Sequence, residues 1–207
     1  MKNSTFNIQH STFKIASLVP YKIIPPVKGG EKAIFLFLKY LTKHCTATIF
    51  SVEENKGFHA GADFLPVLGS TNNKLRYLNL LLFFRIKNIC KKNNITHLVL
   101  EQPYYAWLGW LLKKFAGIKI ILRSHNIEAE RFKSMGKWWW PIMKCYEQFA
   151  HRMAHVNFFI TEEDKDAAIQ QYHLNKKLCT VITYGIERQA APSFEEKAAC
   201  KKIFVPI

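Results

Sequence analysis

The sequence predicts an α/β domain in which helices cover both faces of a parallel β-sheet. Short apolar segments rich in β-branched residues alternate along the chain with longer segments whose apolar residues have helical spacing. Several short segments are hydrophobic throughout, which is typical of strands buried on both faces of a parallel sheet. We therefore expect one Rossmann-like domain over residues 14–186.

The first strand–helix–strand unit is expected near the start of the chain. Residues 14–19 form an apolar run that predicts a strand, and three prolines then prevent regular structure up to Gly29 and Gly30. Residues 31–44 have the spacing of a helix, and residues 46–52 are apolar and β-branched. This order of elements predicts a βαβ unit.

The later segments repeat the alternation after a loop region that could hold a short strand. Strands are expected at residues 96–101, 118–122, 156–160 and 179–183, and helices at residues 72–93, 103–115, 138–154 and 161–172. Thr161 is expected to cap the last helix, because a threonine followed three residues later by an acid is a helix-start signal. Gly117 is expected to end the third helix.

The two ends of the chain differ from the middle. Residues 1–13 are polar, lack the apolar core of a signal peptide and predict a loose leader. Residues 187–207 are polar and charged, and we expect a linker that opens a missing domain. No stretch reaches the ~18–20 apolar residues that span a bilayer. We expect a cytoplasmic protein, which could also be peripheral on the inner face of the cell membrane.

The chain is strongly basic. It has 30 Lys and Arg against 15 Asp and Glu, a formal net charge of +15. Such an excess favours anionic partners, although a lysine-rich proteome explains it equally well. Helix-turn-helix, zinc-finger and RNA-recognition signatures are absent, so nucleic acid is the least favoured partner. The five cysteines are scattered without a C-x-x-C pair, which indicates reduced thiols in the cytosol.

Gly29, Gly30 and Glu31 are the first candidate site. Ligands of open α/β sheets bind at the carboxyl ends of strands. Glycines before a helix allow close approach of a ligand, and the helix start offers free N–H groups to an anion such as a diphosphate. The alternative is a plain turn. The long loop before the glycines is not the tight G-x-G-x-x-G turn, which disfavours NAD binding.

A second candidate follows the strand at residues 118–122 and comprises Ser124, His125, Asn126 and Glu128. Histidine can donate or accept hydrogen bonds near neutral pH, although a lone histidine is more often structural. Two further positions also follow strands. Thr161 is explained by capping alone, and Glu101 could form a wall of the cleft or only a strand-to-helix turn.

Two surface features are candidate membrane contacts. Lys74 and Arg76 begin a basic cluster without an intervening acid. Trp138 and Trp139 belong to a tryptophan triplet that follows several basic residues, and indoles near cations favour an anionic bilayer interface. The alternative is that part of the triplet packs inside, because three consecutive helical residues cannot point one way.

Four segments together resemble a known family. They are KIASLVPYKIIPPVKGGEKAIFLFLKYLTKH, IKIILRSHNIEAERFKS, VNFFITEEDKDAAIQQYH and VITYGIE. This combination resembles the N-terminal domain of glycosyltransferase family 4-like enzymes, which have the two-domain GT-B fold. The resemblance implies that Gly29 and Gly30 approach the donor diphosphate and that His125, with Asn126 beside it, is a catalytic residue next to the transferred sugar. Tyr184 and Gly185 correspond to the turn into the second domain, where Tyr184 replaces the usual Asn.

The same resemblance implies a function. The N-terminal domain binds a glycan or lipid-linked acceptor, and the C-terminal domain binds a nucleotide-diphospho-sugar, so this chain alone should be inactive as a hexosyltransferase. A separate donor-domain chain could complete it. Retention of anomeric configuration is implied, and no metal cofactor is expected. The alternative is a non-catalytic basic α/β module that binds anionic membrane or glycolipid.

Overall fold

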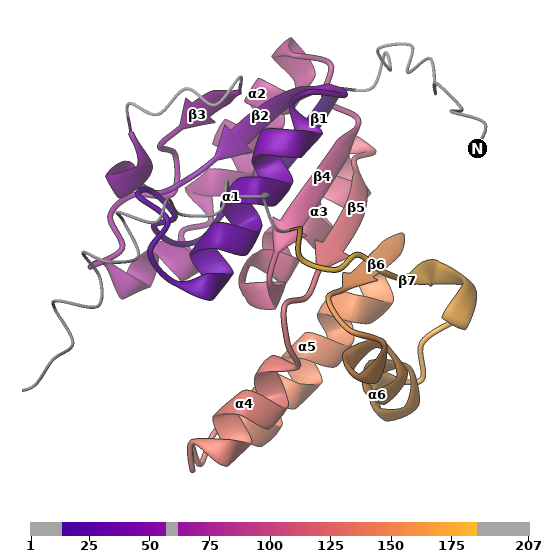
Figure 1. The fold of residues 1–207 in the computed structure, drawn as a ribbon. Helices are drawn as coiled ribbons and strands as arrows, with labels where there is room; N and C mark the ends of the chain where they lie inside the picture. Colours follow the sequence, from indigo (N-terminus) through magenta and orange to yellow (C-terminus); the bar gives the residue numbers. More distant parts are fainter. Residues whose placement is uncertain (1–13, 57–61, 186–207) are drawn as a thin grey trace, which may run out of the picture.

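The computed structural model describes residues 14–56 and 62–185, and its centre is a seven-stranded parallel sheet (Figure 1). The strands are β1 (Lys14–Leu18), β2 (Thr46–Phe50), β3 (Asp63–Leu65), β4 (His97–Glu101), β5 (Lys119–Arg123), β6 (Val156–Phe159) and β7 (Cys179–Val181). The helices are α1 (Gly29–Leu41), α2 (Leu81–Lys92), α3 (Ala106–Ala116), α4 (Glu128–Ser134), α5 (Trp140–Met153) and α6 (Glu162–Tyr172). Short 3₁₀ turns are η1 (Glu53–Asn55), η2 (Lys74–Leu78), η3 (Pro103–Tyr105) and η4 (Lys176–Leu178). The predicted Rossmann-like α/β class is confirmed.

The strand order β3-β2-β1-β4-β5-β6-β7 contains one reversal of direction. The chain first builds outward from β1 through β2 to β3, and then returns to place β4 on the other side of β1. At such a switch point the loops after the two central strands diverge and leave a crevice. The carboxyl ends of β1 and β4 therefore mark where a ligand site is expected.

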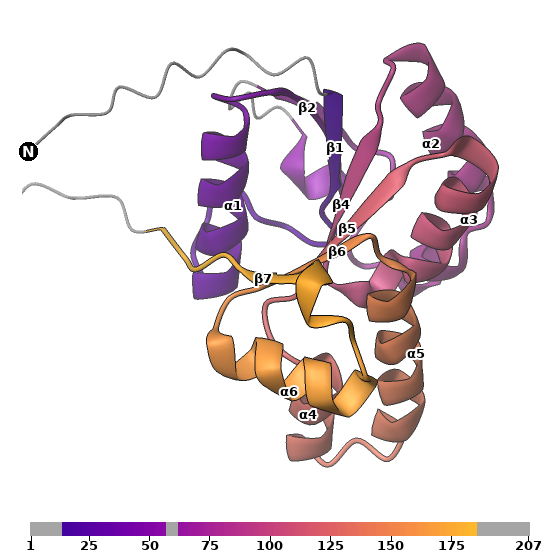
Figure 2. The same ribbon diagram turned by 90° about the vertical axis from the view of Figure 1, so that its right-hand side faces the viewer.

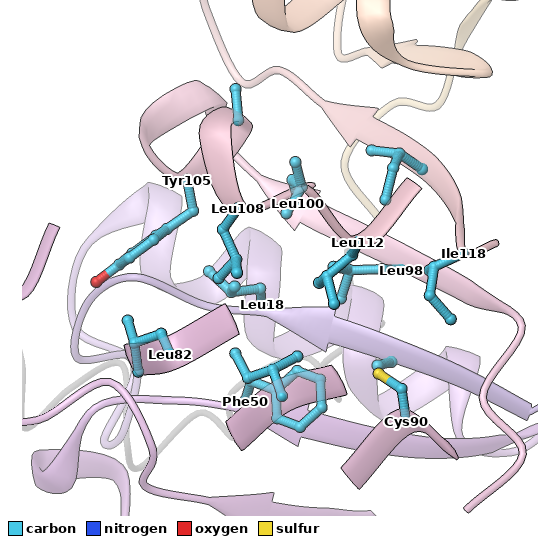
Figure 3. Close-up of a cluster of buried hydrophobic side chains, with 14 of the residues drawn as sticks. Leu18, Phe50, Leu82, Cys90, Leu98, Leu100, Tyr105, Leu108, Leu112 and Ile118 are labelled. Atoms are coloured by element: carbon cyan, nitrogen blue, oxygen red, sulfur yellow. The ribbon is translucent and has the colours of Figure 1, made fainter. Parts of the chain in front are cut away.

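Helices cover the two faces unequally (Figure 2). Helix α1 lies on one face, where Ile34 and Leu38 pack with Ala47 and Ile49 of β2. Helices α2, α3 and α5 lie on the other face and enclose the largest apolar cluster, which Figure 3 shows around Leu98, Leu100 and Leu112. Burial of β4 on both faces explains the continuous apolar run Leu98–Leu100 at its centre.

Gly109 allows α3 to pack closely against the sheet. A Cβ atom at this position would lie 2.9 Å from Cδ1 of Leu100 and 3.1 Å from Cε of Met153. The glycine therefore has a packing role in the middle of α3, where its conformational freedom otherwise costs about 1 kcal/mol relative to alanine.

The expected helix at residues 72–93 is divided into η2 and α2. The side chain of Asn73 accepts a hydrogen bond from the Leu75 amide, and that of Asn79 accepts one from the Leu81 amide. Asparagine side chains that bind nearby amides in this way compete with the helical hydrogen-bond ladder. The prediction of one continuous helix was therefore wrong.

Two capping predictions are confirmed. The Thr161 hydroxyl accepts a hydrogen bond from the Asp164 amide at the start of α6, and Gly117 ends α3 with a φ of 66°. The predicted leader at residues 1–13 and the predicted linker at residues 187–207 lie outside the described residues. Within the described ranges, no helix is long and apolar enough to cross a membrane.

Candidate functional site

An open cleft with a volume of about 580 Å³ lies at the carboxyl ends of β1, β4 and β5. Its walls come from the loop after β1, the start of α1, η2, η3, α4 and the segment after β7. The lining residues are Tyr21, Lys22, Lys28, Gly30, Glu31, Tyr77, Gln102, Tyr104, His125, Asn126, Glu128, Arg131 and Tyr184. Tyrosines and basic residues dominate this set, so the cleft offers aromatic faces and positive charge together.

Three buried charged or polar side chains form a group beneath the cleft, and one of them, His125, lines it. Glu101 ends β4 and Arg123 ends β5, and the parallel register places these two residues directly opposite each other. Nη1 of Arg123 donates to Oε2 of Glu101 at 2.8 Å, and Nε2 of His125 lies 2.8 Å from the same oxygen. The three side chains are between 0% and 7% exposed.

The charge states in this group follow from its geometry. Burial raises the pKa of Glu101, but the Arg123 guanidinium and the His125 hydrogen bond outweigh it, so that the net pKa is lowered and the carboxylate is ionised. A carboxylate only accepts hydrogen bonds, so the shorter contact assigns a proton to Nε2 of His125, and the approach of Nη1 of Arg123 to the same nitrogen at 3.2 Å is then not a hydrogen bond. In the neutral ring Nδ1 is then the acceptor nitrogen, and His125 lines the cleft.

Arg123 is held on its other side by an aromatic ring. Its guanidinium lies 4.3 Å from the ring centroid of Phe37 in α1. This cation–π contact ties the Glu101–Arg123–His125 group to the middle of α1. The position of Glu101, and through it the orientation of His125, therefore depends on packing outside the cleft.

A second polar group lies on the opposite wall. The Tyr104 hydroxyl donates to Oε2 of Glu128 at 2.7 Å, and Nε of Arg131 donates to the same oxygen at 3.0 Å. Burial together with the neighbouring Glu128 carboxylate raises the pKa of Tyr104, so its hydroxyl stays protonated as a donor. This group presents Arg131, whose side chain is 40% exposed, to the cleft.

Helix α4 carries this wall and is fixed by a residue far along the chain. The buried Glu147 carboxylate of α5 accepts hydrogen bonds from the Glu128 and Ala129 amides at 2.9 and 2.8 Å and from the Tyr172 hydroxyl at 2.8 Å. These amides are at the start of α4, where helices leave N–H groups free. Glu147 therefore acts as a cap supplied by tertiary structure, which a local sequence pattern cannot reveal.

The glycines at the start of α1 leave open space around them, and of the two Gly30 lines the cleft, whereas Gly29 does not. A Cβ atom at Gly29 or Gly30 would meet no heavy atom within 4 Å. Glu31 folds back, and its Oε2 accepts hydrogen bonds from the Val27 and Lys28 amides at 2.9 and 3.0 Å, which lower its pKa. Glu31 therefore caps the helix from the edge of the cleft.

The other predicted site residues have different positions. Asn126 lines the cleft and its Oδ1 accepts a hydrogen bond from Gln102 at 3.1 Å, whereas Ser124 is buried and donates to the Asn126 carbonyl oxygen at 2.8 Å. Thr161 is exposed at its cap and does not line this cleft. Tyr184 lines it, with its ring 6.3 Å from that of His125, while Gly185 borders a separate apolar pocket beside α1.

The proposed membrane contacts are only partly on the surface. Arg76 is 6% exposed, stacks 4.2 Å from the Tyr77 ring centroid and donates to the Tyr77 hydroxyl, so the expectation that it faces a membrane was wrong. Lys74 is exposed. Trp138 is 83% exposed, but Trp139 packs on Phe132 with 4.4 Å between ring centroids.

Sequence reasoning missed several residues of the cleft. Tyr21 lies on a loop and Arg131 on an unpredicted helix, whereas Tyr77 and Tyr104 lie on two 3₁₀ turns inside segments that were predicted as helices. Helical periodicity does not show which of these side chains faces a cleft. A usable signal existed for Glu101, because a charged residue ends an otherwise apolar strand. In the described part of the chain, no group of three or more His, Cys, Asp or Glu side chains is placed to hold a metal ion.

The sequence profile of Glycosyltransferase Family 4 matches residues 27–190. This range begins just before the glycines of α1 and includes both polar groups and all the residues that line the cleft except Tyr21 and Lys22. No curated protein sequence matches significantly.

Three solved structures share the fold. A glycosyltransferase from Rickettsia africae is 19% identical, with a TM-score of 0.63, and the match covers 94% of this chain and 50% of that one. Anabaena HepE in complex with UDP and glucose is 15% identical (TM-score 0.60; 84% and 45% covered), and sucrose-phosphate synthase from Thermosynechococcus elongatus is 11% identical (TM-score 0.65; 84% and 48% covered). The chain spans about half the length of these structures.

Proposed function

Because the chain belongs to Glycosyltransferase Family 4, we propose that it is the acceptor-side half of a GT-B enzyme. The reaction is transfer of a hexose from a nucleotide-diphospho-sugar to a hydroxyl of a glycan or lipid-linked acceptor. The observation that carries the proposal is the buried Glu101–Arg123–His125 group, which orients one imidazole at the floor of the cleft. His125 both contacts an ionised carboxylate from the neighbouring strand and lines an open cleft. A histidine with only a structural role requires neither feature.

In this proposal His125 is a catalytic residue that contacts the transferred sugar. Its Nδ1 accepts a hydrogen bond from a sugar hydroxyl, while Glu101 fixes the orientation of the ring through Nε2. The exposed tyrosine faces of the cleft, among them Tyr184, suit packing against sugar rings. Arg131, whose side chain is partly exposed at the cleft, supplies donors to the acceptor, and the Tyr104 hydroxyl can accept from it.

The departing nucleoside diphosphate is proposed to lie at the start of α1. Open space at Gly29 and Gly30 permits close approach, and the N–H groups of the first turn together with Lys22 and Lys28 favour an anion. These groups can stabilise the leaving diphosphate without a metal ion. That Anabaena HepE binds UDP and glucose supports a nucleotide-sugar as the donor.

The donor pocket is proposed to lie on a second domain. The chain spans about half the length of its structural relatives, and the cleft described above opens to one side. The second domain could belong to the same longer chain or to a separate one. We place the assembled enzyme in the cytoplasm, where the scattered free cysteines remain reduced.

A second candidate function is a non-catalytic module that binds anionic membrane or glycolipid. The observation that favours it is Trp138, which is 83% exposed between Lys137 and the start of α5. In this case the cleft would bind a glycan headgroup without transferring sugar.

A transfer assay separates the two. The full chain would be mixed with a panel of UDP- and GDP-sugars and acceptors, alone and with a separately produced donor-side domain of a family member. We expect transfer only in the presence of both parts. Absence of transfer in both settings, with both proteins folded by circular dichroism, would favour the non-catalytic module.

A further inference from the structure

An apolar patch protrudes from η2 and the first turn of α2. It consists of Leu75, Leu78, Leu80, Leu81 and Phe84, whose exposed fractions lie between 61% and 73%. The opposite side of α2 is buried, because Leu82, Ile86 and Cys90 pack in the main core. Five large apolar side chains within ten residues exceed the scattered exposure that is normal for a monomer, and such a patch indicates an interaction surface.

The same helix continues the patch with positive charge. Leu81, Phe84, Asn88 and Lys91 are spaced by three or four residues, so they share the outer face of α2, with Lys92 beside them. No acidic residue occurs between Asp63 and Glu101. Lys74 at the start of η2 is also exposed. Glu53 borders a small pocket together with Arg85, so this basic residue has an acid near it.

The patch is rigidly connected to the cleft. Tyr77 lies in η2 between Leu75 and Leu78 and lines the cleft. Its carbonyl oxygen accepts a hydrogen bond from Nε1 of Trp107 at 2.8 Å, and its ring packs against Tyr105 with 5.1 Å between centroids. A partner that binds the patch therefore lies beside the opening of the cleft.

We propose that this surface docks on an anionic lipid bilayer. Helix α2 would lie along the membrane, with the leucines and Phe84 inserted at the acyl boundary and Lys74, Lys91 and Lys92 against headgroup phosphates. The observation that selects a bilayer is the charge around the patch. A second copy of this chain would bring two basic rims together and repel, whereas an anionic membrane matches both the apolar and the basic parts.

Docking by this patch does not depend on sugar transfer. If the proposed function also holds, the acceptor is lipid-linked, because the cleft opens next to the membrane surface and can receive a headgroup without extracting the lipid. The patch also differs from the exposed Trp138 at the α4–α5 connection, so separate substitutions can test the two surfaces.

Vesicle flotation tests the proposal with the full chain. Wild type is expected to float with phosphatidylglycerol-containing vesicles, to bind phosphatidylcholine vesicles much more weakly, and to dissociate as salt is raised. L81Q/F84Q should weaken binding to the anionic vesicles by at least about tenfold, since both side chains leave the acyl boundary. K91Q/K92Q should weaken the anionic binding and leave the weak neutral binding unchanged.

Matched controls use η4, which lies elsewhere on the surface. L178Q removes an exposed leucine, and K176Q/K177Q removes two exposed lysines; both should bind like wild type. Equal binding of wild type and L81Q/F84Q would overturn the proposal, as would failure of folded wild type to bind anionic vesicles. A wild-type dimer that L81Q/F84Q converts to a monomer, without vesicle binding, would show instead that the patch joins two copies.

Discussion

His125 is oriented by a carboxylate from a different strand. The sequence identified the histidine, because it directly follows an apolar strand, but it left Glu101 as a wall or a turn. The pairing depends on which strands are neighbours and on their register, which sets Glu101 opposite Arg123. A residue's position at a strand end can thus be predicted from the sequence, whereas its partner on another strand follows only from the tertiary structure.

The tautomer of His125 is a direct test of this pairing. Because the ionised Glu101 accepts from Nε2, we expect the neutral wild-type ring to carry its proton on Nε2. Nitrogen-15 shifts of the imidazole report the tautomer. In E101Q the side chain has one acceptor oxygen, which Arg123 also uses, and its NH₂ group can donate to Nε2 of His125. The population of the Nδ1-protonated form of His125 should therefore increase. A wild-type ring protonated on Nδ1 would contradict the geometry.

The buried His151 makes a prediction about pH. It is stacked between Phe159 and Tyr172, and burial lowers its pKa to about 4, although its hydrogen bond to Asn157 raises it slightly. The unfolded chain binds a proton at this position below about pH 6.5, and the folded chain does not until about pH 4. Wild type therefore loses stability from this group as pH falls through that window.

H151Q removes this contribution while it retains a donor towards Asn157. The unfolding free energy of wild type minus that of H151Q should fall by roughly 2–3 kcal/mol as the pH is lowered from about 7 to about 4, because only wild type loses the contribution of His151. Burial raises the pKa of Glu147 to about 7, and this carboxyl, whose Oε1 lies 4.0 Å from Nε2 of His151, acts in the opposite sense in both proteins. Urea unfolding at several pH values measures the effect, and a difference that does not change with pH would count against it.

At the scale of elements, the sequence predicted the strands well and the connections poorly. Continuous apolar runs identify β4 and β5, because Leu98–Leu100 and Ile120–Leu122 are largely buried on both faces of the sheet. Helix α4 was missed because Glu147, 19 residues beyond Glu128, supplies its N-terminal cap. The break between η2 and α2 depends on the side chains of Asn73 and Asn79. In the sequence these two residues are a weaker signal than the apolar periodicity that runs across them.

Gly109 tests how closely α3 packs on the sheet. G109V should lower the unfolding free energy by about 1–3 kcal/mol, because its side chain would overlap Leu100 and Met153. K114V, at an exposed position of the same helix, measures the cost of a β-branched residue alone. The comparison uses urea midpoints, and equal effects of the two substitutions would show that the packing at Gly109 is not tight.

At the scale of the whole molecule, the alternating pattern of the sequence was sufficient to predict a doubly wound sheet, and the sheet fixes the place of the cleft. Loops diverge at the switch between β1 and β4, and the candidate residues from both candidate sites meet there. The apolar patch on α2 was not predicted, because the periodicity of a helix does not show which of its apolar residues lack a partner.

The most direct test of the account is the transfer rate of H125N in the presence of a donor-side domain, compared with wild type and with H173N, a change at an exposed residue outside the cleft. We predict that H125N folds normally and transfers at least about 100-fold more slowly, because the group that contacts the sugar is lost, while H173N keeps the wild-type rate. Transfer by H125N at the wild-type rate would contradict the account.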